Sequence, residues 1–175
     1  MIQAWRAAAG WRIELRPIRP EDEGIWLEFL GSMSWATRYK RGARRIEQLS
    51  AEDVQCALRP RHESELAFIA VAAREGRRDV AGVSRGTFVN ENACEFALVV
   101  ADCWQRHGIG VRLMQTLIDA SVERGHRRIV GRVLASNPGM LEFVGRLGFA
   151  VEEQPGEPYV KRVVLERAAA PPQAG

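Results

Sequence analysis

Residues 93–123 read ACEFALVVADCWQRHGIGVRLMQTLIDASVE, and this stretch predicts three elements in succession. Residues 93–100 are rich in β-branched and aromatic types and are too short for a buried helix, so they predict an interior strand covered on both faces. The turn QRHGIG follows at 105–110. From Ile109 onward apolar residues recur every three or four positions, as in an amphipathic helix, and Gly125 supplies a left-handed stop.

A glycine turn between a strand and a helix is suited to binding phosphate. The first amides of a helix have no internal partner, and the helix dipole adds about half a positive charge there. Gly108 and Gly110 let the backbone turn and approach an anion, and Arg106 adds a cation. A dinucleotide-binding turn would need a third glycine where the chain has Leu113, and a P-loop would need Gly-Lys-Ser/Thr, which the sequence lacks. The remaining pattern is Q/R-x-x-G-x-G after a strand.

Length and composition limit the class of protein. The chain has 175 residues and a net charge of +3, which suits one domain and is too small a charge to indicate nucleic acid as the main partner. Its three cysteines show no C-x-x-C spacing, as in reduced cytoplasmic proteins. No signal-peptide core or long apolar run is present, so we expect a cytoplasmic chain without a membrane partner, either monomeric or homodimeric.

The pattern of elements predicts a single domain over residues 12–167, with a flexible leader at 1–11 and a disordered tail at 168–175. Short polar turns between strands predict an antiparallel meander, and the helix between two later strands predicts a right-handed parallel unit. The expected strands are 11–19, 65–74, 80–89, 93–100, 128–134, 149–153 and 159–166. The expected helices are one opened by Pro20 and those at 50–58, 109–124 and 138–147.

This order of elements resembles the GCN5-related N-acetyltransferase (GNAT) superfamily over residues 13–166. Residues 137–149, NPGMLEFVGRLGF, resemble the family's late motif, in which an Asn opens the last helix. Residues 16–23, RPIRPEDE, and the segment EFALVV resemble the acetyltransferase domain of bacterial protein lysine acetyltransferases of the Pat type. The resemblance implies an α/β (α+β) fold with a mixed, mostly antiparallel sheet of six to seven strands and about four helices. It also implies that the two parallel central strands splay apart.

The resemblance implies that acetyl-coenzyme A lies in the gap between these strands. The turn would hold the pyrophosphate, strand amides would pair with the pantetheine arm, and Asn137 would contact the arm near the sulfur. The implied cofactor-binding residues are Leu98, Val99, Val100, Gln105, Arg106, His107, Gly108, Ile109, Gly110 and Asn137. No metal is expected, because the three histidines lack metal-ligand spacing.

Direct acetyl transfer to an amine needs a base, because a lysine ε-amine with a pKa of about 10.4 is almost fully protonated at neutral pH. Glu95 is the candidate, since it lies where the Pat-type resemblance places the catalytic glutamate. We expect Cys94, Phe96 and Ala97 to desolvate its carboxylate, which favours proton uptake either directly or through a water. The structural alternative is an ion pair with a neighbouring strand. An amide near Val100 would donate to the oxyanion.

One position departs from the family pattern. Many GNAT members carry a tyrosine where this chain has Val144, and that tyrosine protonates the departing thiolate. We assign no general acid, because a coenzyme A thiolate can leave without one and neither Tyr39 nor Tyr159 occupies the matching place. A covalent route through Cys94 or Cys103 lacks an identified base.

The resemblance therefore implies an acetyl-CoA-dependent N-acetyltransferase acting on a primary amine, with the ε-amine of protein lysine as the favoured acceptor. One alternative is acetylation of a small amine such as a polyamine, an amino acid or an antibiotic. Another is a CoA-sensing domain without turnover, which the valine at 144 allows. The basic segment 38–45 is either a solvated loop or a lid bordering the acceptor site.

Overall fold

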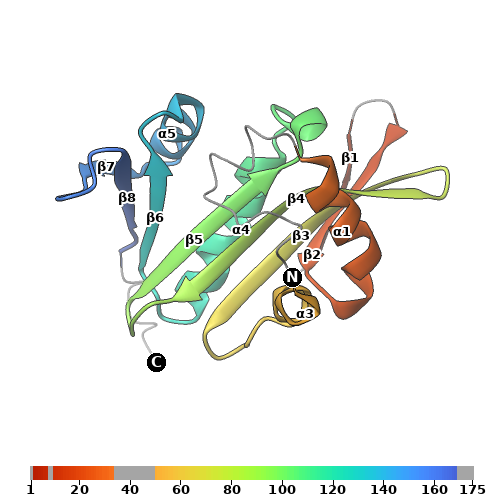
Figure 1. Cartoon of the computed structure of the whole chain (residues 1–175), viewed down its shortest axis with the longest axis horizontal. Helices are drawn as coiled ribbons and strands as arrows, with labels where there is room; N and C mark the ends of the chain where they lie inside the picture. Colours follow the sequence, from red (N-terminus) through yellow and green to blue (C-terminus); the bar gives the residue numbers. More distant parts are fainter. Residues whose placement is uncertain (1, 8–9, 34–49, 169–175) are drawn as a thin grey trace, which may run out of the picture.

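The computed structural model describes residues 2–7, 10–33 and 50–168, and within them one eight-stranded sheet forms the centre of the molecule (Figure 1). All neighbouring strands are antiparallel except the central pair β5 and β6, which is parallel. In spatial order the strands are β1 (Gln3–Arg6), β2 (Arg12–Pro17), β3 (Glu65–Arg74), β4 (Arg77–Phe88), β5 (Ala93–Val100), β6 (Arg128–Leu134), β8 (Val160–Glu166) and β7 (Ala150–Glu153).

Helices cover both faces of the sheet (Figure 1). Ser84 donates a hydrogen bond to the Leu113 carbonyl on one side, whereas the next residue, Arg85, donates to the Ala57 carbonyl on the other. Successive strand residues point to opposite faces, so these two bonds assign α4 and α3 to opposite faces. The described helices are α1 (Glu23–Ser32), α3 (Ala51–Leu58), α4 (Ile109–Glu123) and α5 (Pro138–Arg146), with 3-10 turns η2 (Pro20–Asp22) and η4 (Asp102–Trp104). None of them is long and apolar enough to cross a membrane.

The prediction of a flexible leader is wrong for β1, which adds an eighth strand to the six or seven expected. β1 pairs antiparallel with β2, with Trp5 opposite Ile13. Gln3 and Trp5 are half-buried while the residues between and after them are exposed, and the Gln3 side chain donates to the Thr116 hydroxyl on α4 at 3.3 Å. Four residues with one large apolar side chain give too little periodicity for a strand prediction. Tertiary contacts with β2 and α4 stabilise the strand instead.

A buried ion pair fixes the connection from β2 to α1. Arg16 Nη1 and Nη2 donate to the two carboxylate oxygens of Asp22 at 2.7 and 2.6 Å, and the Arg19 amide donates to the same carboxylate at 2.9 Å. Burial raises the pKa of Asp22, but the hydrogen bonds from Arg16 and Arg19 outweigh it, so this pKa lies below its ordinary value. Arg16, Arg19 and Asp22 of the RPIRPEDE segment therefore have a structural role.

The two parallel strands separate soon after they begin. Their ladder runs only from the pair Ala93/Arg128 to the pair Glu95/Val130, although both strands continue, and they diverge beyond it (Figure 1). The Phe96 ring fills the space under the divergence, because a Cβ added at Gly131 would lie 2.4 Å from it. The ring also meets Phe149 edge-on, with centroids 5.4 Å apart. The splayed sheet expected from the family resemblance is confirmed.

Candidate active site

The turn at 105–110 joins η4 to α4 and has two residues in the left-handed backbone region. Gly108 is the N-cap of α4 with φ +78°, and Arg106 has φ +63°. Gly110 is different, because it lies in the first turn of the helix, and a Cβ there would be 3.5 Å from Val100 and 3.6 Å from Phe143. These are ordinary contacts, so the fold leaves room for a methyl group at 110, whereas the left-handed backbone at 108 favours glycine. A glycine at 110 instead keeps the helix mouth open to a ligand.

The mouth of α4 presents unpaired backbone donors. The first helical bond runs from the Arg112 amide to the Gly108 carbonyl at 3.2 Å, so the amides of residues 109–111 have no intrahelical acceptor. The Gln105 side chain donates to the Val100 carbonyl at 3.3 Å and to Asp102 at 3.1 Å. His107 Nδ1 donates to the Gln105 carbonyl at 2.8 Å. Both predicted side chains thus stabilise the turn, while the amides face outward.

The gap between β5 and β6 is lined by alternate amides of β5. The Ala93 carbonyl accepts from Val89, and the Ala101 amide donates to Ala81, so odd-numbered residues of β5 bond to β4. Backbone groups alternate in direction along a strand, so Leu98 and Val100 direct their amides to the side of the gap. The Val99 amide points to β4, and the prediction that it lines the gap is wrong.

Glu95 lies where the parallel ladder ends. Its Cα partners are Thr87 in β4 and Val130 in β6, and Val130 is the last residue of β6 that pairs with β5. The side chain is half-buried, and within the described part of the chain it makes no hydrogen bond or ion pair. The structural alternative of an ion pair to a neighbouring strand therefore finds no support in this part of the chain.

The surroundings expected for Glu95 are partly wrong. Cys94 and Phe96 flank it in sequence, but strand alternation turns their side chains to the opposite face, where Cys94 lies fully buried near Ser121 of α4. Only Ala97 of the three predicted neighbours shares its face. Burial raises the pKa of the Cys94 thiol, which keeps it protonated and disfavours a covalent route through it. The other candidate, Cys103, is exposed in η4.

Asn137 caps α5, as its position before a proline predicts. Its Oδ1 accepts the Met140 amide at 3.3 Å, which leaves the side-chain NH₂ free to donate elsewhere. Val144 is fully buried in the core and its aliphatic side chain offers no proton donor, and Tyr159 is 81% exposed. Tyr39 and the basic segment 38–45 lie outside the described residues.

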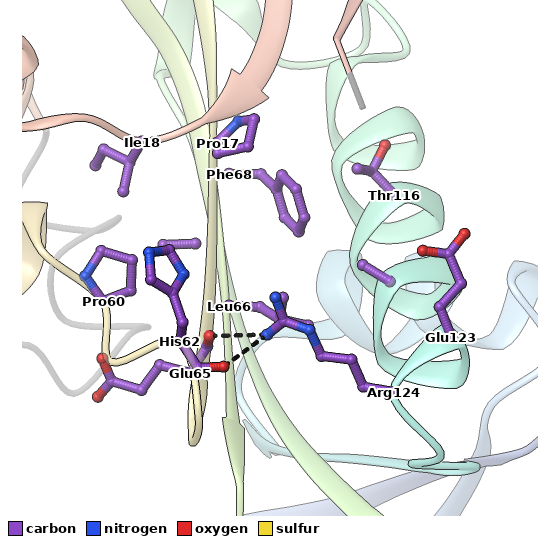
Figure 2. A pocket seen from close by; sticks show the side chains of 12 residues that line it. Pro17, Ile18, Pro60, His62, Glu65, Leu66, Phe68, Thr116, Glu123 and Arg124 are labelled. Atoms are coloured by element: carbon purple, nitrogen blue, oxygen red, sulfur yellow. Dashed lines mark hydrogen bonds between the residues drawn. The ribbon is translucent and has the colours of Figure 1, made fainter.

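Two further features escaped sequence reasoning. Arg112 on α4 places its guanidinium carbon 4.4 Å from the centre of the Trp5 ring. Separately, a cavity of about 220 Å³ lies between α4 and the start of β3, where Arg124 donates to the His62 and Glu65 carbonyls (Figure 2). None of the predicted site residues lines this cavity. The sequence signal for Arg112 is its position, because it is a basic residue four positions after Gly108.

Comparison with known proteins decides the family. A model described as the acetyltransferase (GNAT) family matches residues 30–149, which is more than half of the chain. The chain belongs to the GNAT family. A curated relative, the acetyltransferase PA5475 of Pseudomonas aeruginosa, is 29% identical over 149 residues, which cover 85% of this chain and 80% of that protein.

Solved acetyltransferase structures share the fold. The GNAT domain of S. lividans PAT has a TM-score of 0.81 at 22% identity, covering 95% of this chain and 97% of that one. Spermidine N-acetyltransferase from Vibrio cholerae, in complex with CoA and spermine, has a TM-score of 0.71 at 17% identity, covering 88% and 95%. The protein is thus an acetyl-CoA-dependent N-acetyltransferase, and the donors at the mouth of α4 fit a ligand that carries phosphates.

Proposed function

We propose that the protein moves an acetyl group directly from acetyl-CoA to a primary amine, with the ε-amine of protein lysine as the favoured acceptor and Glu95 as the base. The observation that carries this proposal is the position of Glu95. Its carboxylate has no partner among the described residues and lies at the point where β5 and β6 separate. A carboxylate kept unpaired there is available to a substrate.

The cofactor is held by three groups of donors in this proposal. The outward amides of residues 109–111 and the Arg106 side chain bind the diphosphate. The amides of Leu98 and Val100 pair with the amide-containing pantetheine arm, as an added strand would. The free NH₂ of Asn137 contacts the arm near the sulfur. Gln105 and His107 act indirectly by stabilising the turn.

The chemistry at the thioester then needs few protein groups. Glu95 accepts a proton from the amine, directly or through one water, so that the nitrogen lone pair can attack the thioester carbonyl carbon. A backbone amide near Val100 donates to the carbonyl oxygen as negative charge develops on it. The C–N bond forms, the nitrogen loses its second proton to solvent, the C–S bond breaks, and the sulfur leaves as a thiolate that takes a proton from solvent. No general acid is assigned, because Val144 replaces the family's tyrosine.

The preference for lysine rests on the segment EFALVV, which contains the proposed base and resembles the Pat-type domains. The RPIRPEDE segment indicates a relationship to the Pat-type domains but does not bear on the choice of acceptor, because Arg16 and Asp22 form a structural ion pair. The catalytic role of Glu95 and the choice of acceptor are therefore tested separately.

Glu95→Gln tests the base, because the amide keeps the size of the side chain and cannot accept a proton at neutral pH. We expect acetyl-CoA to bind with wild-type affinity and kcat to fall by about 10²–10⁴. Titration calorimetry measures the first quantity, and release of the free CoA thiol measures the second. Glu91→Gln is the matched control, since Glu91 lies in the exposed turn before β5. Wild-type turnover by Glu95→Gln would exclude Glu95 as the base.

A panel of acceptors tests the lysine assignment. Lysine-containing proteins and peptides are compared with polyamines, amino acids and aminoglycosides by kcat/KM in the same thiol assay. We expect the highest values for protein lysine. Efficient turnover of a small amine, with none on protein, would replace the lysine assignment by small-amine acetylation and leave the role of Glu95 intact.

A further inference from the structure

We propose that Arg112, held by the Trp5 ring of the N-terminal strand, binds the 3′-phosphate of coenzyme A and so makes the enzyme select CoA over its dephosphorylated form. The inference rests on acetyl-CoA as the donor and is independent of the acceptor and of Glu95. It assigns a function to β1, a strand that the phosphate-binding turn itself does not require.

Arg112 leans toward the phosphate-binding turn. Long side chains on a helix point back toward its N-terminus, so the guanidinium of Arg112 lies toward Gly108, four residues earlier. Both residues line one open hollow of about 570 Å³. Arg112 is exposed and forms no ion pair within the described part of the chain, so its charge is available to a ligand.

The N-terminal strand fixes the direction of this side chain. The Trp5 ring lies 4.4 Å from the guanidinium carbon, within the range of a cation–π contact. Gln3, two residues before Trp5, donates a hydrogen bond to Thr116, which lies one helical turn after Arg112. β1 therefore contacts α4 at two successive turns of the helix. A long side chain held in one direction loses less entropy on binding.

A second tryptophan connects the same hairpin to the turn. Trp11, immediately before β2, packs edge-on against Trp104 with ring centroids 5.3 Å apart. The ring centroids of Trp104 and His107 are 6.0 Å apart. The N-terminal hairpin thus contacts the residues on either side of the turn, Trp104 before it and Arg112 after it. Of these two tryptophans, Trp5 is the one that contacts a cation, the Arg112 guanidinium.

The order of groups along coenzyme A assigns the phosphate. Gly110 faces Val100 and Phe143, on the side of the gap where the pantetheine arm enters. Arg112 lies two residues on, about 200° around the helix, and so on the opposite flank. With the arm on one side and the diphosphate over the turn, the ribose and its 3′-phosphate lie on the far side, beside Arg112.

The test compares CoA with 3′-dephospho-CoA by titration calorimetry at one ionic strength, because contacts between exposed charges are screened by salt. We expect the wild type to prefer CoA by roughly tenfold, a factor that corresponds to about 1.4 kcal/mol. Arg112→Ala removes the preference and leaves the affinity for dephospho-CoA unchanged. Equal loss of affinity for both ligands in Arg112→Ala, or no preference in the wild type, overturns the proposal.

Variants of Trp5 test its positioning role. Trp5→Ala reduces the preference for CoA, whereas Trp5→Phe retains it because an aromatic face remains under the guanidinium. If Trp5→Ala stays folded by circular dichroism and keeps the full preference, the positioning role is excluded. If that variant does not fold, Trp5→Phe and Trp5→Leu give the same comparison between an aromatic and an aliphatic side chain.

Two other arginines complete the design. Arg61, exposed before β3, is the control, and Arg61→Ala keeps the wild-type preference. Arg106→Ala weakens binding of both ligands alike, because Arg106 lies in the turn that holds the diphosphate. If Arg106→Ala removes the preference instead, the 3′-phosphate lies beside Arg106 and the assignment to Arg112 is overturned.

Discussion

Glu95 and Asp22 are acidic residues whose surroundings differ sharply. Asp22 is 2% exposed and bonded to Arg16, which is itself 3% exposed, whereas Glu95 is half-buried without a partner in the described residues. Paired buried charges maintain structure, and an unpaired carboxylate at a strand branch point is free for chemistry. Both side chains are carboxylates, so residue type alone does not distinguish their roles. Their partners distinguish them.

Removal of Asp22 alone should destabilise the fold strongly. Asp22→Leu leaves the Arg16 charge buried and unpaired, so we expect the free energy of unfolding to fall by about 3–5 kcal/mol. The double variant Arg16→Met/Asp22→Leu removes both charges and should recover most of that loss. Urea unfolding at neutral pH measures both. A single variant as stable as the wild type would contradict the buried ion pair.

The same pair should make stability depend on pH in acid. The pKa of Asp22 is lower in the folded state than the value of about 3.9 expected in the unfolded chain. Its contribution is therefore complete above the unfolded value and is lost as pH falls through the folded value. The stability difference between the wild type and Asp22→Leu should shrink below about pH 4, as urea midpoints at several pH values will show.

Cys94 should take no part in acetyl transfer. Its thiol is fully buried on the face opposite Glu95, and burial raises the pKa of this thiol. We expect Cys94→Ala to keep wild-type kcat, and intact-mass spectra of the enzyme with acetyl-CoA alone to show no stable acetyl adduct. Cys103→Ala is the companion variant. An adduct that disappears with either substitution would indicate a covalent route.

At the scale of elements, the turn before α4 shows that two glycines of one motif have different functions. Gly108 has a left-handed backbone, whereas Gly110 has helical geometry and space for a methyl group. The β3–β4 hairpin gives a similar lesson. The strands expected at 65–74 and 80–89 leave a five-residue connection between them, but Glu75 and Gly76 alone reverse the chain with positive φ values, and the ladder already includes Arg74/Arg77.

Alanine at these two glycines should therefore have opposite effects on stability. Gly108→Ala forces a Cβ into the left-handed region and should cost about 1–2 kcal/mol. Gly110→Ala should leave stability unchanged or raise it by up to about 1 kcal/mol, because alanine favours a helix. It should still weaken acetyl-CoA binding, since the methyl group obstructs the helix mouth. Thermal melts and calorimetry separate the two effects, and a less stable Gly110→Ala would contradict the assignment.

At the scale of the whole molecule, the sheet consists of two parts joined by a short parallel ladder. β1 to β5 form one antiparallel part and β6, β8 and β7 the other, with three residue pairs between β5 and β6. Phe96, Gly131 and Phe149 fill the space beneath the divergence. A ligand arm in the gap would therefore contact both parts of the sheet and stabilise the folded state.

Acetyl-CoA should raise the melting temperature and slow hydrogen exchange at Leu98 and Val100. At a concentration of 100 times Kd the gain is about 2.7 kcal/mol for a ligand that binds only the folded state. Adenosine 3′,5′-bisphosphate is the control, since it lacks the pantetheine arm and should leave exchange at these two amides unchanged. Equal exchange at both amides with and without acetyl-CoA would exclude an arm bound along β5.

Sequence periodicity was sufficient for the elements that build the site. The limits expected for the strands at 93–100 and 128–134 match β5 and β6, and the helix from Ile109 matches α4 to within a residue. Asn137 as an N-cap was also read correctly. These features depend on neighbouring residues, since the repeats of 2 and 3.6 residues and the capping preferences are local properties of the chain.

Tertiary structure decided the rest. β1 forms because it pairs with β2 and bonds to α4. The gap between β5 and β6 opens where the Phe96 ring packs against Gly131, which lies 35 positions later in the sequence. The contact of Trp5 with Arg112 likewise joins residues more than a hundred positions apart. Such contacts depend on which surfaces the folded chain brings together, and periodicity carries no information about that choice. The sequence alone thus determined the strand, the glycine turn and the helix at 93–123, and only the fold determined what surrounds them.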